Sequence, residues 1–538
     1  MVASTAVSEH TPLNSSYRSR PPLPDTLREV PRSSWILLSG LYIGVFLSAL
    51  DSTMVATLAT EISSGFGRQN ESSWLGTSYL LTVAASQGLY GRFSDIVGRK
   101  AAALFSISCF ALGTLGCAIS SSMNMIIIAR AVAGIGGAGL TTISSIIASD
   151  LVSLRQRGTL QGIANINFGL GASLGGPIGG FLSAKYGFRF AFLIQLPLCL
   201  MSFVIVILYC HIELPAGETT PMEKLKQIDF LGALTLVTAT TLLVGAASVG
   251  GNILPWSSPY VLAALVSAII VLGMFIYIEM YVAKSPVLPP SIVFRRTPGF
   301  AALTNFFGAA ASFAFLYTAP IYFQVVLQAS AQTTGLHFLP NALGIPFGSL
   351  LAGALLARNG RYYWLTLMFL ICAPLSALSL ASWGRHPPEW RTWFDIFFNG
   401  FGMAGATTTT LLAMLSNVGS QELAVATGLS YLARSNGQVL GVAVSAAILQ
   451  GLLQTQLERR IPNHKLVEKI RRDASVVKHL KPKFREQAIE SYKVAGQWTF
   501  VSIAAMGLLG VLSATMIHER PVEKGMVIDD EPIEDREG

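Results

Sequence analysis

The chain has 538 residues, of which 52% are hydrophobic and only 12% are charged, and its mean hydropathy is +0.54. These values exclude a soluble globular protein of this size and predict an all-α membrane protein that crosses the bilayer many times. The formal net charge is +8, but the Lys and Arg residues are scattered over loops between apolar runs. We therefore expect them to set the membrane topology and not to bind nucleic acid.

A membrane-spanning helix needs about 20 apolar residues, and such runs occur fourteen times along the chain. Six predicted spans form an N-terminal bundle within residues 34–211, and they cover 35–60, 74–93, 100–119, 123–149, 159–184 and 189–211. Two more, 229–250 and 258–283, lie in a linker of residues 212–298. The last six form a C-terminal bundle within residues 299–517, and they cover 299–327, 333–357, 362–383, 392–416, 424–452 and 496–517.

Two tails flank the spans. Residues 1–33 are rich in Ser, Pro and Arg and lack an apolar core segment, which predicts a disordered cytosolic tail and not a signal peptide. Residues 518–538 carry an acidic cluster and form a second predicted tail. Most Lys and Arg residues of the short loops share the side of the N-terminal tail, so this side is expected to be cytosolic. An even number of spans then returns the C-terminus to the cytosol.

Two predictions concern the opposite, non-cytosolic side. Asn70 begins the sequon Asn70-Glu71-Ser72 in the first non-cytosolic loop and is a predicted glycosylation site. Residues 453–495 form a long basic loop that the span count places on this side, against the charge rule, and a miscounted span is the alternative. The alternation of charged and apolar residues in this loop predicts a short amphipathic helix at the membrane surface.

The chain contains an internal repeat. The stretch Gly134–Thr142 recurs 266 positions later as Gly400–Thr408, and Gly171 and Gly175 recur at the same spacing. The polar stretch Gly91–Lys100 recurs 262 positions later. Spans 1–6 therefore correspond to spans 9–14, which predicts two six-helix bundles around a central cavity, with spans 7 and 8 inserted between them.

The polar stretch between the second and third spans is a candidate gating element. Its candidate residues are Gly91, Asp95, Gly98, Arg99 and Lys100. We expect a tight turn at the membrane surface, in which Asp95 can pair with Arg99 or face the start of a neighbouring helix and so favour one closed conformation. Ala357 takes the place of the acid in the repeat, so this latch is expected to be asymmetric. A turn that only sets topology is the alternative.

Four charged residues fall inside predicted spans, where a charge is costly and is kept mainly when it faces a cavity or a partner. They are Asp51, Arg130, Asp395 and Arg434. Asp51 can bind and release a proton or bind a cationic substrate directly, and a structural hydrogen bond is the alternative. For Arg130, the alternative is a buried side chain satisfied by backbone carbonyls.

Uncharged polar residues of the second half are further candidates to line the cavity. For each of them, a hydrogen bond between helices is the alternative. These residues are Asn305, Tyr317, Tyr322, Gln324, Asn341, Asn399, Asn436 and Gln438.

Several stretches resemble a known family. Gly91–Lys100 resembles the signature loop between helices 2 and 3 of the major facilitator superfamily. Leu50–Val55, the motif Arg130-x-x-x-Gly134 and the run Gly171–Gly180 resemble the fourteen-span drug:proton antiporter branch. Three more stretches resemble fungal vacuolar basic amino acid transporters, and these are Trp74–Tyr79, Leu154–Gly158 and Phe188–Pro197.

This resemblance implies a major facilitator fold of fourteen transmembrane helices, a role for Arg130 in proton transfer or in orienting the substrate, and an antiporter helix. The residues of that helix are Gly171, Gly175, Gly176, Pro177 and Gly180, for which helix packing alone is the alternative. It also implies exchange of protons for basic amino acids across the vacuolar membrane. The alternatives are plasma-membrane efflux of drugs or toxic metabolites and, in another class, a sensor that does not transport.

Catalysis and cofactors are not expected. No nucleotide-binding G-x-x-x-x-G-K-[ST] motif, metal cluster or nucleophile–base pair is readable in the sequence. We therefore expect a transporter that is not an enzyme, holds no metal, and works as a monomer in the lipid bilayer with a small molecule and protons as its partners.

Overall fold

The computed structural model describes residues 32–68, 71–151, 154–211, 230–250, 254, 256–283, 290–418 and 422–519. These residues fold into helices and contain no sheet. The predicted glycosylation site Asn70 and most of both predicted tails lie outside the described residues.

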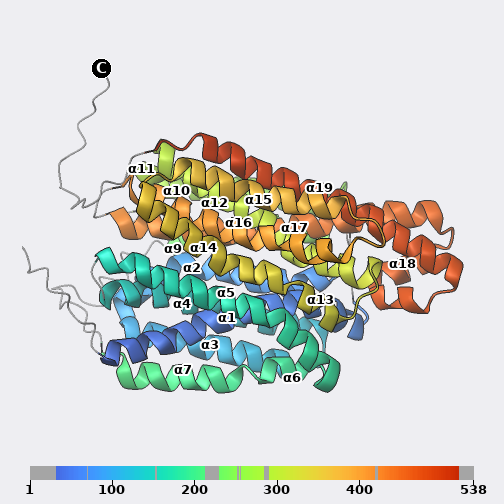
Figure 1. Cartoon of the computed structure of the whole chain (residues 1–538), viewed down its shortest axis with the longest axis horizontal. Coiled ribbons are helices and arrows are strands. Elements are labelled where there is room, and N and C mark those ends of the chain that lie inside the picture. The colour runs from blue at the N-terminus through green and yellow to red at the C-terminus, as the bar shows by residue number, and fades with distance from the viewer. Residues whose placement is uncertain are drawn as a thin grey trace, which may run out of the picture.

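The first six predicted spans form one bundle, drawn from blue to teal in Figure 1. Its helices are α1 (Arg32–Gly65), α2 (Ser72–Val97), α3 (Arg99–Ile119), α4 (Met123–Leu151), α5 (Leu154–Tyr186), α6 (Phe188–Leu193) and α7 (Leu196–Tyr209). The sixth span is divided between α6 and α7, because the helix is interrupted at Ile194 and Gln195, and Pro197 lies in the first turn of α7. Gln195 lies at this break and is buried inside the bundle, with 1% of its surface accessible to solvent.

The linker and the second bundle follow. Their elements are α9 (Phe230–Val249), α10 (Pro259–Tyr281), α11 (Pro290–Val293), α12 (Arg296–Ile321), the π-helix η2 (Tyr322–Val326), α13 (Ala331–His337), α14 (Leu339–Asn359), α15 (Tyr363–Ala381), α16 (Glu389–Leu415), α17 (Leu423–Arg460), α18 (His464–Arg472), the 3-10 helix η4 (Ala474–His479) and α19 (Pro482–Thr515). Helix α9 contacts both α2 and α17, so the inserted pair lies against both bundles.

Helical segments occupy every predicted span, and ten helices of the described residues are long and apolar enough to cross a bilayer. Large apolar side chains such as Leu112, Leu234 and Ile269 are 64%, 65% and 69% exposed, as expected for a surface that faces lipid. The all-α membrane fold with two bundles is therefore confirmed, while the count of fourteen spans stays a prediction.

Glycines bring equivalent helices together in the two bundles. A Cβ atom on Gly175 of α5 would lie 2.2 Å from the carbonyl oxygen of Leu50 in α1. A Cβ atom on Gly441 of α17 would lie 2.2 Å from the carbonyl oxygen of Ala310 in α12. Only glycine permits such close backbone contact, so the sequence repeat reproduces the same helix crossing in each half.

The polar stretch Gly91–Lys100 differs from the expected tight turn. Helix α2 continues to Val97, and the interruption is confined to Gly98, whose φ of +93° favours glycine. The repeat has the same construction, because α14 continues to Asn359 and Gly360 has φ +65°. The helices can continue past the apolar run because polar side chains are tolerated where a helix end leaves the bilayer.

The predicted basic loop 453–495 is helical, and we call it the cap. It consists of the end of α17, α18, η4 and the start of α19, and it projects beyond the bundles at the right of Figure 1. We call this side of the molecule the cap end and the side where α1 begins the tail end. The expected amphipathic helix is present as α18, but Val467 and Ile470 on its apolar face are buried in the same core as Tyr492 of α19. This face packs inside the cap and is not available to the membrane.

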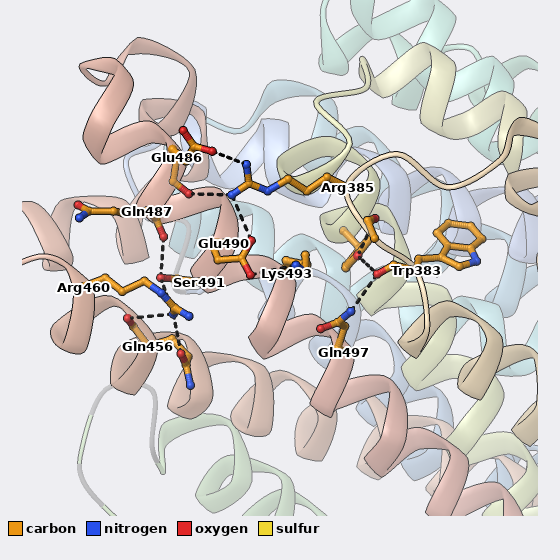
Figure 2. A network of polar contacts seen from close by, with 12 residues as sticks. Trp383, Arg385, Gln456, Arg460, Glu486, Gln487, Glu490, Ser491, Lys493 and Gln497 are labelled. Atoms are coloured by element: carbon orange, nitrogen blue, oxygen red, sulfur yellow. Dashed lines mark hydrogen bonds and ion pairs between the residues drawn. The ribbon is translucent and has the colours of Figure 1, made fainter.

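Polar contacts fasten the cap to the second bundle, as Figure 2 shows. Arg385, between α15 and α16, donates to the carboxylates of Glu486 at 2.7 Å and Glu490 at 3.1 Å. These two carboxylates also raise the pKa of the Arg385 guanidinium. Deeper in the same network, Nε2 of Gln497 donates to the carbonyl oxygen of Trp383 at 2.9 Å.

Candidate functional site

Two of the predicted intramembrane charges form a buried ion pair. Asp51 lies in the middle of α1, and Arg130 lies about two turns from the start of α4. Nη1 of Arg130 donates to Oδ2 of Asp51, and the two side chains are 1% and 0% exposed. A charge in such a site is stable only with its partner, because little solvent remains to compensate it.

The first bundle holds this pair from several sides. Nε of Arg130 donates to the carbonyl oxygen of Leu75 at 3.1 Å, and its guanidinium lies 4.3 Å from the centroid of the Tyr79 ring. The Tyr79 hydroxyl is 2.9 Å from the hydroxyl of Ser48. Gln195, in the break between α6 and α7, donates to Oδ1 of Asp51 over a long 3.5 Å.

Several buried polar atoms of the pair, and of the segments that contact it, have no hydrogen-bond partner among the described residues. They are Nη2 of Arg130, Oε1 of Gln195 and the hydroxyls of Thr77 and Ser78. The hydroxyls of Ser52 and Tyr317 also make no well-oriented hydrogen bond, but they lie within reach of each other. Each unbonded group costs about 1–3 kcal/mol, so an assembly of them is unusual for a purely structural core. These atoms therefore have unused hydrogen-bonding capacity.

The candidate gating residues bind helix ends at the tail end. Nε of Arg99 donates to Oδ2 of Asp150 in α4 at 2.9 Å, and Nη1 of the same side chain donates to Ser94 at 2.7 Å. Lys100 donates to the carbonyl oxygen of Ile207 in the last turn of α7 at 2.6 Å, a favourable position for a cation. Asp95 belongs to the last turn of α2, but its side chain lies outside the described residues, so its predicted pairing stays a prediction.

Helix α5, the predicted antiporter helix, has two glycine faces with different partners. Gly171 and Gly175 lie against α1 within the first bundle. Gly176 lies against the backbone of Gly335, and a Cβ atom on Gly180 would lie 2.9 Å from the carbonyl oxygen of Ala331, both in α13 of the second bundle. Pro177 lies inside the helix between these contacts. The second face therefore belongs to the contact between the bundles at the cap end.

The other two intramembrane charges have partners in the second bundle. The Asp395 carboxylate accepts hydrogen bonds from Nε1 of Trp383 at 2.9 Å, from Nε of Arg391 at 3.1 Å and from Ser379. Arg434 lies 4.5 Å from the centroid of the Tyr431 ring and lines a small cavity with Asn305. Neither side chain contributes a described contact to the Asp51–Arg130 pair.

Sequence reasoning did not assign Tyr79 or Gln195 to the site. Both lie in stretches that carried the family resemblance, Trp74–Tyr79 and Phe188–Pro197. A polar residue inside an apolar span was the available signal, and it was used for Asp51 but not for Gln195. Among the described residues, no group of three His, Cys, Asp or Glu side chains could hold a metal ion.

Fungal transporters share most of this chain. It is 37% identical over 498 residues to multidrug resistance protein fnx1 of Schizosaccharomyces pombe, covering 91% of this chain and 94% of that protein. It is 34% identical to the vacuolar membrane amino acid uptake transporter fnx2 of the same organism, covering 94% and 88%. It is 31% identical to vacuolar basic amino acid transporter 2 of Saccharomyces cerevisiae, covering 79% and 93%.

A solved structure shares the fold. A bacterial homologue of the human lysosomal transporter Spinster, in an inward-facing and occupied conformation, matches with a TM-score of 0.61 at 14% identity, covering 90% of this chain and 96% of that one. The family profile of the Major Facilitator Superfamily matches residues 41–442. The chain therefore belongs to the Major Facilitator Superfamily and is a multi-pass membrane transporter, not an enzyme.

Proposed function

We propose that this transporter is a proton-coupled antiporter that moves basic amino acids across a fungal vacuolar membrane by alternating access, acting as a monomer. The buried Asp51–Arg130 pair carries the proposal. A proton that binds Asp51 cancels its charge and leaves the Arg130 cation without a counterion. Such a state is unfavourable in a dry site, so proton binding must be accompanied by a rearrangement of the protein.

The relatives and the charge of the site support the substrate class. One relative is named for vacuolar amino acid uptake and another for vacuolar basic amino acid transport. A cationic substrate and a proton would compete for the same Asp51 carboxylate, and this competition is the relation that an antiporter requires. The remaining unbonded groups of Gln195, Thr77 and Ser78 offer hydrogen bonds to a polar substrate.

The test is uptake of radiolabelled lysine, arginine and histidine by vacuolar vesicles with and without the protein, at an imposed pH gradient. We expect uptake that a protonophore abolishes. The Asp51→Asn variant should lose most of this gradient-driven uptake, about tenfold or more, which corresponds to a coupling free energy of at least about 1.4 kcal/mol. Gradient-driven uptake that persists unchanged in Asp51→Asn would refute proton coupling through this residue.

A matched control is Glu458→Gln. This change also removes one carboxylate, but Glu458 is exposed on the cap, where Gln454 donates to it at 2.8 Å. Gradient-driven uptake should stay within about twofold of the original protein, since an exposed side chain contributes little.

Efflux of drugs at the plasma membrane is the second candidate, because the relative at 37% identity is named as a multidrug resistance protein. A fluorescent fusion and drug-susceptibility measurements distinguish the two. Fluorescence at the cell surface, altered drug resistance and no difference in vesicular amino acid uptake would replace the vacuolar proposal with the efflux one.

A further inference from the structure

Tyr317 of α12 crosses from the second bundle into the first. Its ring lies directly on Gly76 of α2, where a Cβ atom would be 2.3 Å from Cε1 and 2.7 Å from the hydroxyl oxygen of Tyr317. The tyrosine side chain is only 8% exposed. Any other residue at position 76 would occupy the space of the ring, so glycine is what admits Tyr317 to this place.

The hydroxyl of Tyr317 lies beside the ion pair. It lies within hydrogen-bond reach of Ser52, which follows Asp51 in α1, and close to both Asp51 and Arg130. On the other side, Leu75, which precedes Gly76, accepts the hydrogen bond from Nε of Arg130. Tyr317 is thus a residue of the second bundle that reaches the charged pair of the first.

Tyr317 and Arg130 have complementary unused groups. The Tyr317 hydroxyl and Nη2 of Arg130 are buried, and neither makes a well-oriented hydrogen bond among the described residues. The Ser52 hydroxyl lies within reach of the Tyr317 hydroxyl, whose second lone pair is still free to accept from Arg130. A guanidinium N–H donates, and a phenol oxygen accepts, so the two can form a charge-assisted hydrogen bond. In the structure, Arg130 instead forms its ion pair with Asp51, within the first bundle.

We propose that Tyr317 is a positioning residue that couples protonation of Asp51 to closure of the two bundles at the cap end. When Asp51 is ionised, it holds Arg130 inside the first bundle. When a proton neutralises Asp51, the ion pair weakens and Nη2 of Arg130 donates to the Tyr317 hydroxyl. Protonation thereby exchanges a contact within one bundle for a contact between the two.

The direction of this exchange agrees with the proposed function, on whose proton coupling it rests. Helix α2 begins at the cap end, one turn before Gly76. Helix α13, which follows Tyr317 in the sequence, also begins at the cap end. If the cap end faces the acidic vacuolar lumen, a proton taken from the lumen closes that end and favours opening toward the cytosol, where the proton leaves. Loss of the proton releases Tyr317 and permits the cap end to open with substrate bound.

The test measures closure without any substrate. Spin labels are placed through cysteines at Tyr186, the last residue of α5, and Trp390 in the first turn of α16, which are 57% and 63% exposed at the cap end. The two half-buried native cysteines, Cys109 and Cys372, are replaced by Ala. The distance between the labels is measured in nanodiscs at acidic and at alkaline pH, in this background and in Tyr317→Phe.

We expect a shorter distance at acidic pH in the background protein and loss of this pH response in Tyr317→Phe, which keeps the ring on Gly76. A charge-assisted hydrogen bond changes the ratio of closed to open molecules by about tenfold or more. Tyr322→Phe is the matched control, because its buried hydroxyl donates to the carbonyl of Trp383 within the second bundle at 3.1 Å. This variant should keep the response.

An unchanged pH response in Tyr317→Phe, an equal loss in Tyr322→Phe, or no response in the background protein would each overturn the inference. Failure of the substrate assignment is distinguishable. A protein that shows the pH response, loses it in Tyr317→Phe and does not transport basic amino acids keeps this inference and refutes only the substrate.

Discussion

The Asp51–Arg130 pair is assembled from segments that are distant in the sequence. The sequence predicted both residues as candidates, because each is a charge inside an apolar run. Their pairing spans 79 positions and depends on how α1 packs against α4, which hydropathy does not encode. The contribution of Gln195 depends on a break in the sixth span that is hidden within an apolar stretch. Individual charges were therefore predictable, and their partners were not.

The pair makes a prediction about stability. Asp51→Asn leaves the Arg130 charge buried and unpaired, which should lower the free energy of unfolding by about 3–5 kcal/mol. The double variant Asp51→Asn/Arg130→Gln removes the stranded charge and should recover most of this loss, so the two changes are not additive. Thermal unfolding of the purified variants measures both. Equal melting temperatures for the original protein and Asp51→Asn would show that Arg130 has another source of compensation.

Asp395 makes a contrasting prediction, since its carboxylate is already occupied by Trp383, Arg391 and Ser379. Asp395→Ala leaves the indole N–H of the fully buried Trp383 without an acceptor, and we expect a loss of about 1–3 kcal/mol in the free energy of unfolding. The dependence of transport on the proton gradient should remain. Uptake and melting temperature of the purified variant are measured together to distinguish a structural role of Asp395 from a role in coupling. Loss of the gradient dependence at an unchanged melting temperature would assign Asp395 to the coupling chemistry.

At the scale of elements, α5 shows what a glycine pattern does and does not predict. The spacing of Gly171, Gly175, Gly176 and Gly180 predicts two small-residue pairs on a helix. It does not show that one pair contacts α1 and the other contacts α13 in the opposite bundle. Partner helices depend on the whole arrangement, so the same local pattern serves internal packing on one face and contact between bundles on the other.

The first of these faces can be tested with Gly175→Ala. The added Cβ atom would lie 2.2 Å from the carbonyl oxygen of Leu50, a backbone atom that cannot move aside cheaply. We expect a loss of about 1–3 kcal/mol or more in stability, seen as a lower melting temperature and a lower yield of folded protein. Gly451→Ala in α17 is the control, because nothing lies within 4 Å of its Cβ position, and it should be neutral or slightly stabilising. Similar melting temperatures for both variants would contradict the close packing of α5 on α1.

The cap is helical, although hydropathy predicts a loop over residues 453–495. Hydropathy counting ended one span at 452 and began the next at 496, because charged residues follow and precede these positions. The extensions of α17 and α19 nevertheless keep an apolar face, with Leu453, Leu457 and Ala488 buried against α18 and its neighbours. The charged residues occupy the outer face of these helices. A hydropathy average over consecutive residues therefore hides the helical periodicity of the apolar residues.

At the scale of the whole molecule, the two bundles touch at several levels. At the cap end, Nε2 of Gln324 donates to the carbonyl oxygen of Thr57 at 3.1 Å. Nearer the tail end, Nδ2 of Asn165 donates to Ser349 at 3.1 Å, and Ser435 bonds Gln87. These bonds lie between packed helices, so the proposed alternating access requires only that one set opens while the other persists.

Residues at the two ends of the molecule can be used to measure its orientation in the membrane and to identify that membrane. The structure places the cap and the connection between α11 and α12 at opposite ends of the helices (Figure 1). From the positive-inside rule we predict that the cap lies on the non-cytosolic side despite its basic charge, because long segments obey this rule weakly. Cysteine at His479 of η4 then reports the non-cytosolic side, and cysteine at the 73%-exposed Phe294 reports the cytosolic side.

We expect a membrane-impermeant maleimide to label Phe294→Cys on intact vacuoles and to label His479→Cys only after the vacuoles are permeabilised. Four native cysteines lie within helices and Cys210 directly follows α7, all five are buried or half-buried, and the unsubstituted protein gives the background. Labelling of His479→Cys on intact vacuoles would reverse the orientation and imply a miscounted span. The lumen and the cell exterior are both on the non-cytosolic side. Labelling of His479→Cys on intact cells, with no protein recovered in vacuoles, would therefore place the cap outside the cell. This result would favour the efflux function.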